Sequence, residues 1–358
     1  MSWLGSLLKR PPMPLIGLDI SSSSIKLVEL GQDKHGDWIV ERFGLEPLQS
    51  GSVVDGNVEN FDQVVEALKR LLKKSGTRVH HAVLALPQSA VITKRISLPG
   101  TLSEQELEVQ VEAEASQYLP FPLEEVSLDF CVIGESTKRR GEIDLLFAAT
   151  RKEKVQERSD IALLAGLTPV VIDVTSYASR LAASSWMSAL PPAAGGDLVA
   201  LIKLGSRNFS LQIVRNDEIL YGLEQGMGGA QLTQLISNQY GISEAEAERR
   251  KCEDDMPAGC EEVVLRPFIA NLAQDIARAL QIFFSSTSYR SINHIGIYGG
   301  TACLRGVAQA IQDHTCVPVT VLNPFNGMKG PSSGRQAPSQ GAPMYLTACG
   351  LAMRRYVS

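Results

Sequence analysis

Hydrophobic and polar positions follow the same order in two separate stretches of the chain. Residues 15–30 (LIGLDISSSSIKLVEL) and 199–214 (VALIKLGSRNFSLQIV) each predict a strand, a tight polar turn and a second strand. Consecutive backbone N–H groups in a tight turn point at one anion, so two such hairpins facing across a cleft can hold phosphate groups from both sides. Superposing the stretches pairs Asp19 with Lys203, Ser21 with Gly205 and Ser22 with Ser206.

The remaining pattern of the first half predicts a sheet with a helix against it. Strands are expected at residues 38–45 and 79–86, and the second is almost continuously apolar, as in a strand buried on both faces. A helix is expected at residues 60–74, where apolar residues share one face and Gly76 follows.

Residues 91–166 change in character and predict a small α+β module inserted into the first domain. Its first helix begins at Ser103, which forms a capping box with Glu106, and ends at the prolines of residues 117–122 (QYLPFP). A strand, a helix, two strands and a final helix make a complete unit. The strands are expected at residues 91–98, 126–133 and 143–149, and the final helix at 154–165.

The chain then returns to the main sheet of the first domain before the hairpin is repeated. A strand at residues 170–174 and a helix rich in small residues at 176–183 lead to a linker at 191–196, after which the second hairpin begins. A buried strand at residues 292–298 is followed directly by Gly299, Gly300 and Thr301. Further elements are expected as a strand at 219–223 and helices near 230–236, 243–252, 267–284 and 345–355.

Composition limits the classes of function. The 358 residues are enough for two domains, 44% of them are hydrophobic, and the net charge of -5 argues against nucleic acid as the main partner. The six cysteines lack zinc-site spacing and suit a reducing, cytoplasmic setting. No apolar run approaches the roughly 18 residues of a membrane-spanning helix. We expect residues 1–14 to be a flexible tail, the alternative being a weak amphipathic foot on a membrane surface.

Neither a P-loop pattern nor a GxGxxG pattern occurs in the chain. Glycines at Gly299 and Gly300 let a flat ligand lie against bare backbone, which suits an adenine and its first phosphate. Taken alone, these glycines predict only a turn between a strand and a helix. Combined with the duplicated hairpin and two helices rich in small residues, they indicate a nucleotide site.

These residues carry a resemblance to the actin-like ATPase superfamily. Residues 15–30 resemble its first phosphate loop, 199–211 the second, and 295–306 (IGIYGGTACLRG) the adenosine motif. Within the superfamily the chain is similar to the PilM family of type IV pilus assembly proteins, relatives of the cell-division protein FtsA. That closer resemblance rests on the segments ITKRISL, QYLPFPLEEVSLDF, LRPF, LNPF and ACGLAMR.

The resemblance implies an α/β, actin-like (ribonuclease H-like) duplicated two-domain fold with an inserted FtsA-type α+β subdomain. Residues 15–90 with 167–190 are expected to form the first actin-like domain, and residues 91–166 the inserted subdomain. Residues 197–358 are expected to form the second domain, with a helical subdomain at about 230–290 and a connecting helix at 344–356.

The same resemblance implies which residues bind a nucleotide, ATP or ADP. Asp19 matches the acid that lies near the metal and phosphates in the family. The other implied residues are those of the two turns, those of the adenosine motif, and a Glu/Lys pair that flanks the ribose. The alternative for this pair is structural, because exposed Glu and Lys at this spacing are common on solvated helices. The implied set is Ser21, Ser22, Ser23, Ser24, Lys26, Lys203, Gly205, Ser206, Glu248, Lys251, Gly299, Gly300 and Thr301.

Two departures from the family pattern concern turnover. Lys203 replaces an Asp that helps to hold Mg²⁺, and Thr175 stands where PilM proteins usually have Glu. Arg207 adds a bulky side chain to the second loop. Hydrolysis needs positioned water and a metal that bridges the phosphates. We therefore expect weak or metal-free nucleotide binding, with Lys203 neutralising phosphate charge, and little hydrolysis.

The family resemblance also implies partners and location. In PilM-like proteins, a groove between the first subdomain and the inserted module accepts the cytoplasmic N-terminal peptide of the inner-membrane protein PilN, which would place this chain on the cytoplasmic face of the inner membrane. Pilus motor ATPases and self-association are further expectations. Here the groove wall is expected to include Ile92, Lys94, Tyr118, Leu119 and Phe121, although Leu119 and Phe121 also suit a core position.

Two other functions remain open from the sequence. A filament-forming, FtsA-like ATPase associated with the membrane would have an amphipathic C-terminal helix after a linker, whereas the last helix here is expected to belong to the fold. A small-molecule kinase on the same fold would need a catalytic carboxylate in the cleft and a substrate domain, and neither is evident in the sequence.

Overall fold

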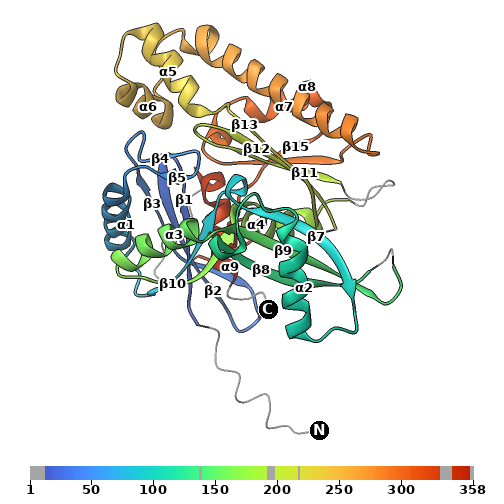
Figure 1. Cartoon of the computed structure of the whole chain (residues 1–358). Helices are drawn as coiled ribbons and strands as arrows, with labels where there is room; N and C mark the ends of the chain where they lie inside the picture. The colour runs from blue at the N-terminus through green and yellow to red at the C-terminus, as the bar shows by residue number, and fades with distance from the viewer. Residues whose placement is uncertain (1–12, 137–138, 192–197, 217, 331–340, 355–358) are drawn as a thin grey trace.

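Two five-stranded sheets with the same strand order form the framework of the molecule (Figure 1). The computed structural model describes residues 13–136, 139–191, 198–216, 218–330 and 341–354. The predicted tail at residues 1–14 and the predicted linker at 191–196 therefore lie mostly outside the described residues.

The first sheet has the order β10-β6-β1-β2-β3. Its central strand β1 pairs antiparallel with β2 and parallel with β6, so the hairpin and the crossover meet on one strand. The strands are β1 (Ile16–Ile20), β2 (Ser24–Gln32), β3 (Trp38–Pro47), β6 (His81–Leu86) and β10 (Thr168–Val174).

The second sheet repeats this arrangement in the order β13-β12-β11-β14-β15. Its central strand β11 pairs antiparallel with β12 and parallel with β14. The repeated hairpin is confirmed down to its register, because Ile20 pairs with Ile25 around loop 21–24 and Leu204 pairs with Phe209 around loop 205–208. The strands are β11 (Val199–Leu204), β12 (Phe209–Arg215), β13 (Glu218–Gln225), β14 (His294–Tyr298) and β15 (Val319–Val321).

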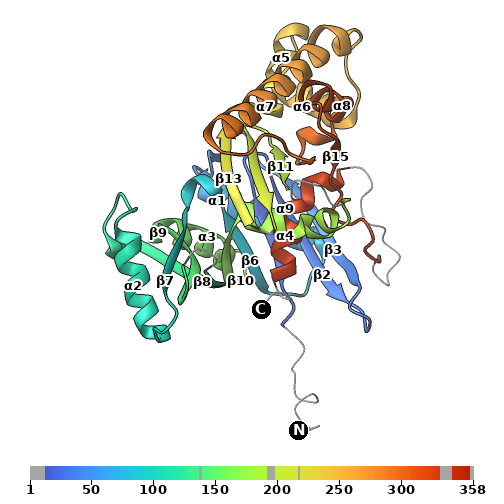
Figure 2. The ribbon, with the colours of Figure 1, turned by 90° about the vertical axis from the view of Figure 1, so that its right-hand side faces the viewer.

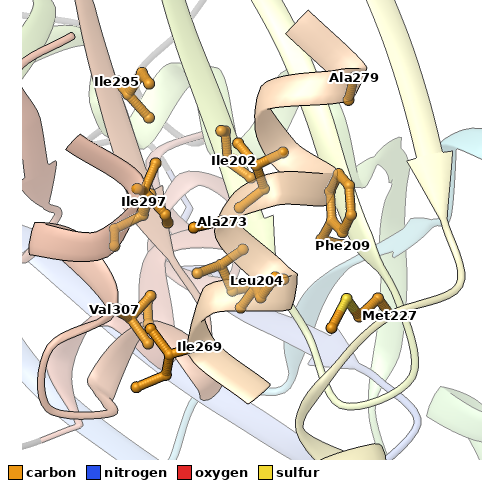
Figure 3. Close-up of a cluster of buried hydrophobic side chains, with 14 of the residues drawn as sticks. Ile202, Leu204, Phe209, Met227, Ile269, Ala273, Ala279, Ile295, Ile297 and Val307 are labelled. Carbon is orange, nitrogen blue, oxygen red and sulfur yellow. The ribbon is translucent and has the colours of Figure 1, made fainter. Parts of the chain in front are cut away.

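Helices cover the outer faces of both sheets. On the second sheet, α7 (Arg266–Ser286) and α8 (Val307–Thr315) bury their apolar stripes in one core with β11 and β14 (Figure 3). The shorter α5 (Gly229–Tyr240) and α6 (Glu244–Glu253) lie at the far end of this domain (Figure 1). On the first sheet, α1 (Phe61–Ser75) is capped by Asn60 and ends at Gly76, whose φ is 63°.

Two further helices lie between the sheets. α4 (Thr175–Ser188) and α9 (Leu346–Met353) share a core with residues of both sheets. They cross so closely that a Cβ on Gly350 would lie 1.7 Å from the carbonyl oxygen of Ala178. The small residues predicted on these helices are therefore required by the crossing.

The inserted module is a three-stranded sheet covered by one helix, and it lies to one side of the first sheet (Figure 2). Its strands β7 (Ile92–Pro99), β8 (Val126–Glu135) and β9 (Glu142–Arg151) have the order β7-β9-β8. α2 (Glu104–Ser116) begins with the predicted capping box between Ser103 and Glu106.

One helix expected to complete the inserted module packs against the core of the first domain. Ile161 and Ala162 of α3 (Lys152–Leu164) are fully buried in the core that α1 forms with β1 and β6. The periodicity of a helix shows which face is buried but not which sheet covers it, and the domain boundary at residue 166 stays a prediction.

Among the described residues, no helix is both long enough and apolar enough to cross a membrane.

Short elements connect the two domains and the inserted module. The short elements are the hairpin of β4 (Val53–Val54) and β5 (Asn57–Val58), the 3₁₀ turns Gln88–Ala90, Leu123–Glu125, Thr301–Cys303 and Ala342–Tyr345, and the π-helical turn Glu261–Leu265.

Candidate functional site

The two hairpin loops face each other across the space between the domains. Asp19 lies near the end of β1 and Lys203 near the end of β11, and Lys203 Nζ is 4.0 Å from Asp19 Oδ1. The residues that correspond in the repeat are thus neighbours in space. An acid of one hairpin and a cation of the other form a contact between the two halves.

A second lysine reaches the same carboxylate. Lys26 is the cross-strand partner of Asp19, and its Nζ lies 3.4 Å from Asp19 Oδ2 and donates to Ser21 Oγ at 2.8 Å. Asp19 and Lys26 are only 2% and 6% exposed. Burial by itself would raise the pKa of Asp19, but Lys203 and Lys26 outweigh it and hold that pKa below its ordinary value.

This arrangement does not fit a magnesium ion. Mg²⁺ in nucleotide sites is held by carboxylate oxygens, phosphates and water. Each carboxylate oxygen of Asp19 instead faces a lysine, Oδ2 toward Lys26 and Oδ1 toward Lys203. A divalent cation beside Asp19 would have to approach two ammonium groups, so the positive charge that a metal would bring is already present.

Two serines of the first loop, Ser21 and Ser24, are hydrogen-bonded to each other. The backbone N–H and the hydroxyl of Ser21 both donate to the carbonyl of Ser24, at 3.1 and 2.9 Å. The carbonyl of Ser23 accepts from the backbone N–H of Leu48. These hydrogen bonds hold the loop in one conformation, and Ser22 lies at its tip.

The second loop is fixed by contacts to the start of α5. The carbonyls of Gly205 and Ser206 accept from the N–H groups of Gly229 and Ala230, at 3.0 and 2.8 Å. The N–H of Gly205 donates to the carbonyl of Asn208. The carbonyls of this loop are thereby directed into the second domain.

The predicted adenosine motif lies against the second loop. Thr301 Oγ1 donates to the carbonyl of Gly205 at 2.7 Å. Gly299 has φ 97°, and a Cβ there would lie 2.4 Å from the carbonyl oxygen of Leu204. Gly300 follows in the turn that carries the chain from β14 to Thr301. Only glycine at position 299 permits this approach of two backbone segments.

Glu248 and Lys251 join the same cluster from α6. Lys251 Nζ donates to the carbonyl of Gly229 at 3.0 Å, to Thr233 Oγ1 at 2.7 Å and to Glu248 Oε2 at 2.5 Å. Burial would raise the pKa of Glu248, but the charge of Lys251 and its hydrogen bond lower it overall. The lysine is thus held against α5, and the pair is more than an exposed ion pair on a helix.

Thr175 begins α4, between the sheets. Its carbonyl accepts a hydrogen bond from Ser179 Oγ at 2.8 Å, and Ser179 in turn contacts Thr347 of α9. The position carries a hydroxyl that cannot act as a base at neutral pH.

Arg158 was missed by the sequence reasoning. It is fully buried, and one guanidinium nitrogen donates to the carbonyl of Gly56 at 2.6 Å, fixing the turn between β4 and β5. Its charge is also one of the influences that lower the pKa of Asp19. The signal for this turn was Asp55-Gly56, a dipeptide typical of a two-residue hairpin loop.

Comparison with known proteins identifies the family. A family model for the type IV pilus assembly protein PilM matches residues 17–356. The chain belongs to the PilM family.

Solved structures agree with this assignment. A chain of a PilM–PilN type IV pilus biogenesis complex is 26% identical over 97% of this chain and 100% of that one, with a TM-score of 0.81. Ethanolamine utilization protein EutJ from Carboxydothermus hydrogenoformans is 17% identical, with a TM-score of 0.58 and coverages of 96% and 90%. The nucleotide-free diol dehydratase-reactivating factor is 10% identical, with a TM-score of 0.56 and coverages of 96% and 99%. These relatives share the predicted actin-like fold.

The residues predicted to contact a partner of this PilM-family chain gather at one corner of the inserted module. Lys94 Nζ lies 5.1 Å from the centre of the Tyr118 ring, and Arg151 lies 4.8 Å from that of Phe121. Leu119 and Phe121 are partly buried against the core of the module, as the alternative interpretation held.

Strand alternation divides β7 between two faces. Ile92 and Lys94 pair with Ala149 and Phe147, whose side chains belong to the core covered by α2. Thr93 pairs with Ala148, which packs toward the first domain against Val174. Ile92 and Lys94, which were predicted for the groove wall, thus lie on the α2 side of β7, and the face toward the first domain is formed by the alternate residues, such as Thr93.

Proposed function

We propose that this chain is a cytoplasmic scaffold of a type IV pilus assembly platform on the inner membrane. It binds the cytoplasmic N-terminal peptide of a PilN-like membrane protein. The observation that carries the proposal is the similarity, over its whole length, to a chain of a PilM–PilN complex. Membership of the PilM family supports it.

Exposed apolar residues between the inserted module and the first domain support a peptide groove there. β10 is an edge strand of the first sheet, and its Val170 and Val171 are 38% and 39% exposed. β8 is an edge strand of the module, and its Ile133 is 49% exposed. An edge strand offers unpaired backbone groups, and apolar side chains beside it suit an extended apolar peptide.

Side chains of the first domain and of the inserted module meet beside the edge strands β10 and β8. Arg354, which follows the end of α9, forms a bidentate pair with Asp173 of β10, at 2.5 and 2.7 Å. Cys131 of β8 lies close enough to Tyr177 and Arg354 to influence the pKa values of both. The groove would thus have apolar walls and a charged end.

A binding experiment tests the peptide proposal. A labelled peptide with the N-terminal cytoplasmic residues of the cognate PilN-like protein is titrated with the intact chain. The expected result is saturable binding that Val171→Glu weakens at least about tenfold, because a charge would enter an apolar contact. Val263→Glu, at a 56% exposed position in the second domain, is the matched control and should bind normally. Absence of binding by the wild type, or equal loss in both variants, would contradict the proposal.

We further propose that the cleft holds a nucleotide without a metal and hydrolyses it very slowly. The two lysines on Asp19 support this, because they supply positive charge to phosphates where other superfamily members use Mg²⁺. Thr175 supports slow turnover, since it offers no carboxylate to orient attacking water. Phosphate release from ATP by the purified protein, abolished by Asp19→Asn in a variant that still folds, would refute it.

A further inference from the structure

Exposed apolar side chains gather where α3 ends and β10 begins. Leu163 and Leu164 are the last residues of the helix, and Val170 and Val171 lie in the first half of the strand. These four side chains are between 38% and 59% exposed, and only residues 165–167 separate the two elements. Apolar side chains that are exposed together mark a surface that another segment or molecule covers. We call these four residues the β10 patch.

An open strand edge lies beside the β10 patch. β10 is an outermost strand of the first sheet, and β6 is its neighbour there. The backbone N–H and C=O groups on the other side of an edge strand can pair with an added segment. The patch therefore combines apolar side chains with open backbone groups, which are the two features that bind a short apolar peptide.

The start of β1 lies at the same end of the sheet as the β10 patch. β1 and β10 run parallel to β6 on its two sides, and Gly17 and Val171 both pair with Val83. Two strand spacings, about 10 Å, separate Gly17 from Val171. Met13 precedes Gly17 by four residues and is exposed. The chain before Met13 is thus attached at the end of the sheet where the patch lies.

Residues 1–12, with the sequence MSWLGSLLKRPP, lie outside the described part of the chain. They include four large apolar side chains, those of Trp3, Leu4, Leu7 and Leu8. Twelve residues can extend over about 40 Å, at roughly 3.3–3.6 Å per residue, so the segment can reach the whole patch. A short tether also gives an effective concentration of about one millimolar, so even a contact with a dissociation constant of about one millimolar would form half of the time.

We propose that the chain's own N-terminal segment covers the β10 patch through its apolar side chains and competes there with the peptide of a PilN-like protein. The competition rests on the proposed peptide groove, because Val170 and Val171 belong to both surfaces. The docking of the segment needs no partner. A partner peptide has to displace the segment before it binds, so its apparent affinity is reduced in proportion to the fraction of molecules whose patch is free.

Fluorescence quenching of Trp3 tests the docking without a partner. The signal of Trp3 is the difference between the wild type and Trp3→Phe, since the other two tryptophans are present in both. Acrylamide should quench Trp3 less in the protein than in a synthetic peptide of residues 1–12. Val171→Glu and Leu164→Glu should each remove this protection, because a charge enters an apolar contact. Val263→Glu, at an exposed position of the second domain, is the matched control and should keep it.

Titration with the N-terminal peptide of the cognate PilN-like protein tests the competition. Leu7→Glu combined with Leu8→Glu in the full chain should tighten peptide binding about tenfold, the factor expected if the segment covers the patch about nine-tenths of the time. Ser2→Glu combined with Ser6→Glu is the matched control, because it adds the same charges to the segment and keeps the apolar side chains. This control should bind the peptide like the wild type. Thermal unfolding checks that each variant is folded.

The outcomes separate the two proposals. Equal quenching of Trp3 in the protein and in the free peptide would overturn the docking, as would protection that Val171→Glu and Leu164→Glu leave unchanged. Protection that appears only with added anionic lipid vesicles would also overturn it and show that the segment binds a membrane. Protection that rises with protein concentration would show that a second copy supplies the segment, which contradicts a contact within one chain.

The partner titration adds two further outcomes. Partner binding that the Leu7 and Leu8 replacements leave unchanged would overturn the competition and leave the proposed groove intact. Protection of Trp3 together with no binding of the partner peptide to any variant would refute the proposed function and leave the docking of the segment standing.

Discussion

Lys203 Nζ lies 4.0 Å from Asp19 Oδ1, and this contact joins equivalent positions of the two halves of a duplicated fold. A carboxylate at position 203 would face Asp19 and require a cation between them. The lysine makes the cluster self-compensating, with Lys26 on its other side. The lysine at position 203, which argues against a bound metal, therefore also holds the two hairpins together.

Removing either lysine should destabilise the protein, but by different amounts. Lys26 is almost fully buried, so Lys26→Met removes a partner from a buried charge and should lower the free energy of unfolding by about 3–5 kcal/mol. The Lys203 side chain is 25% exposed, and Lys203→Met should cost only about 1 kcal/mol. Urea unfolding of both variants measures the difference. A larger cost for Lys203→Met would contradict the assignment of Lys26 as the main partner.

Stability should depend on the protonation of Asp19. Its pKa is lowered in the folded protein, so ionised Asp19 contributes stability that is present above its unfolded pKa of about 3.9 and is lost as the pH falls through the folded pKa. The free-energy difference between the wild type and Asp19→Asn should therefore shrink as the pH is lowered from 7 toward 3. A difference independent of pH would show that the charge of Asp19 does not matter.

The crossing of α4 and α9 should not tolerate a side chain at Gly350. A Cβ there would lie 1.7 Å from the carbonyl oxygen of Ala178, so Gly350→Ala must move one helix and should cost about 3 kcal/mol or more. Gly222→Ala is the control, because a Cβ at Gly222 meets nothing within 4 Å. Thermal or urea unfolding compares the two. Equal stabilities would mean that the helices are farther apart.

Much of the framework could be predicted because the sequence repeats itself. Matching residues 15–30 with 199–214 predicted two hairpins with one geometry, and both sheets have the corresponding register. The pairing of Lys26 with Asp19 could also be predicted from the sequence, because counting residues outward from loop 21–24 along both strands places these two opposite each other.

Other features depend on tertiary contacts that local pattern does not encode. The apolar face of α3 was evident, but the sheet that covers it was not, because both the module and the first domain could have accepted it. Arg207 and Lys154 line the same pocket only because of how the two domains are joined. The turn at Asp55-Gly56 carried a local signal that was overlooked among longer elements.

Calorimetric titration with ATP in EDTA and in excess Mg²⁺ tests the central claim, that lysine charge replaces the metal in the cleft. Wild-type protein should bind with affinities that agree within about twofold in the two buffers, whereas Lys203→Asp should bind at least about tenfold more tightly with Mg²⁺ than without it. Wild-type binding that disappears in EDTA and returns with Mg²⁺ would contradict the account.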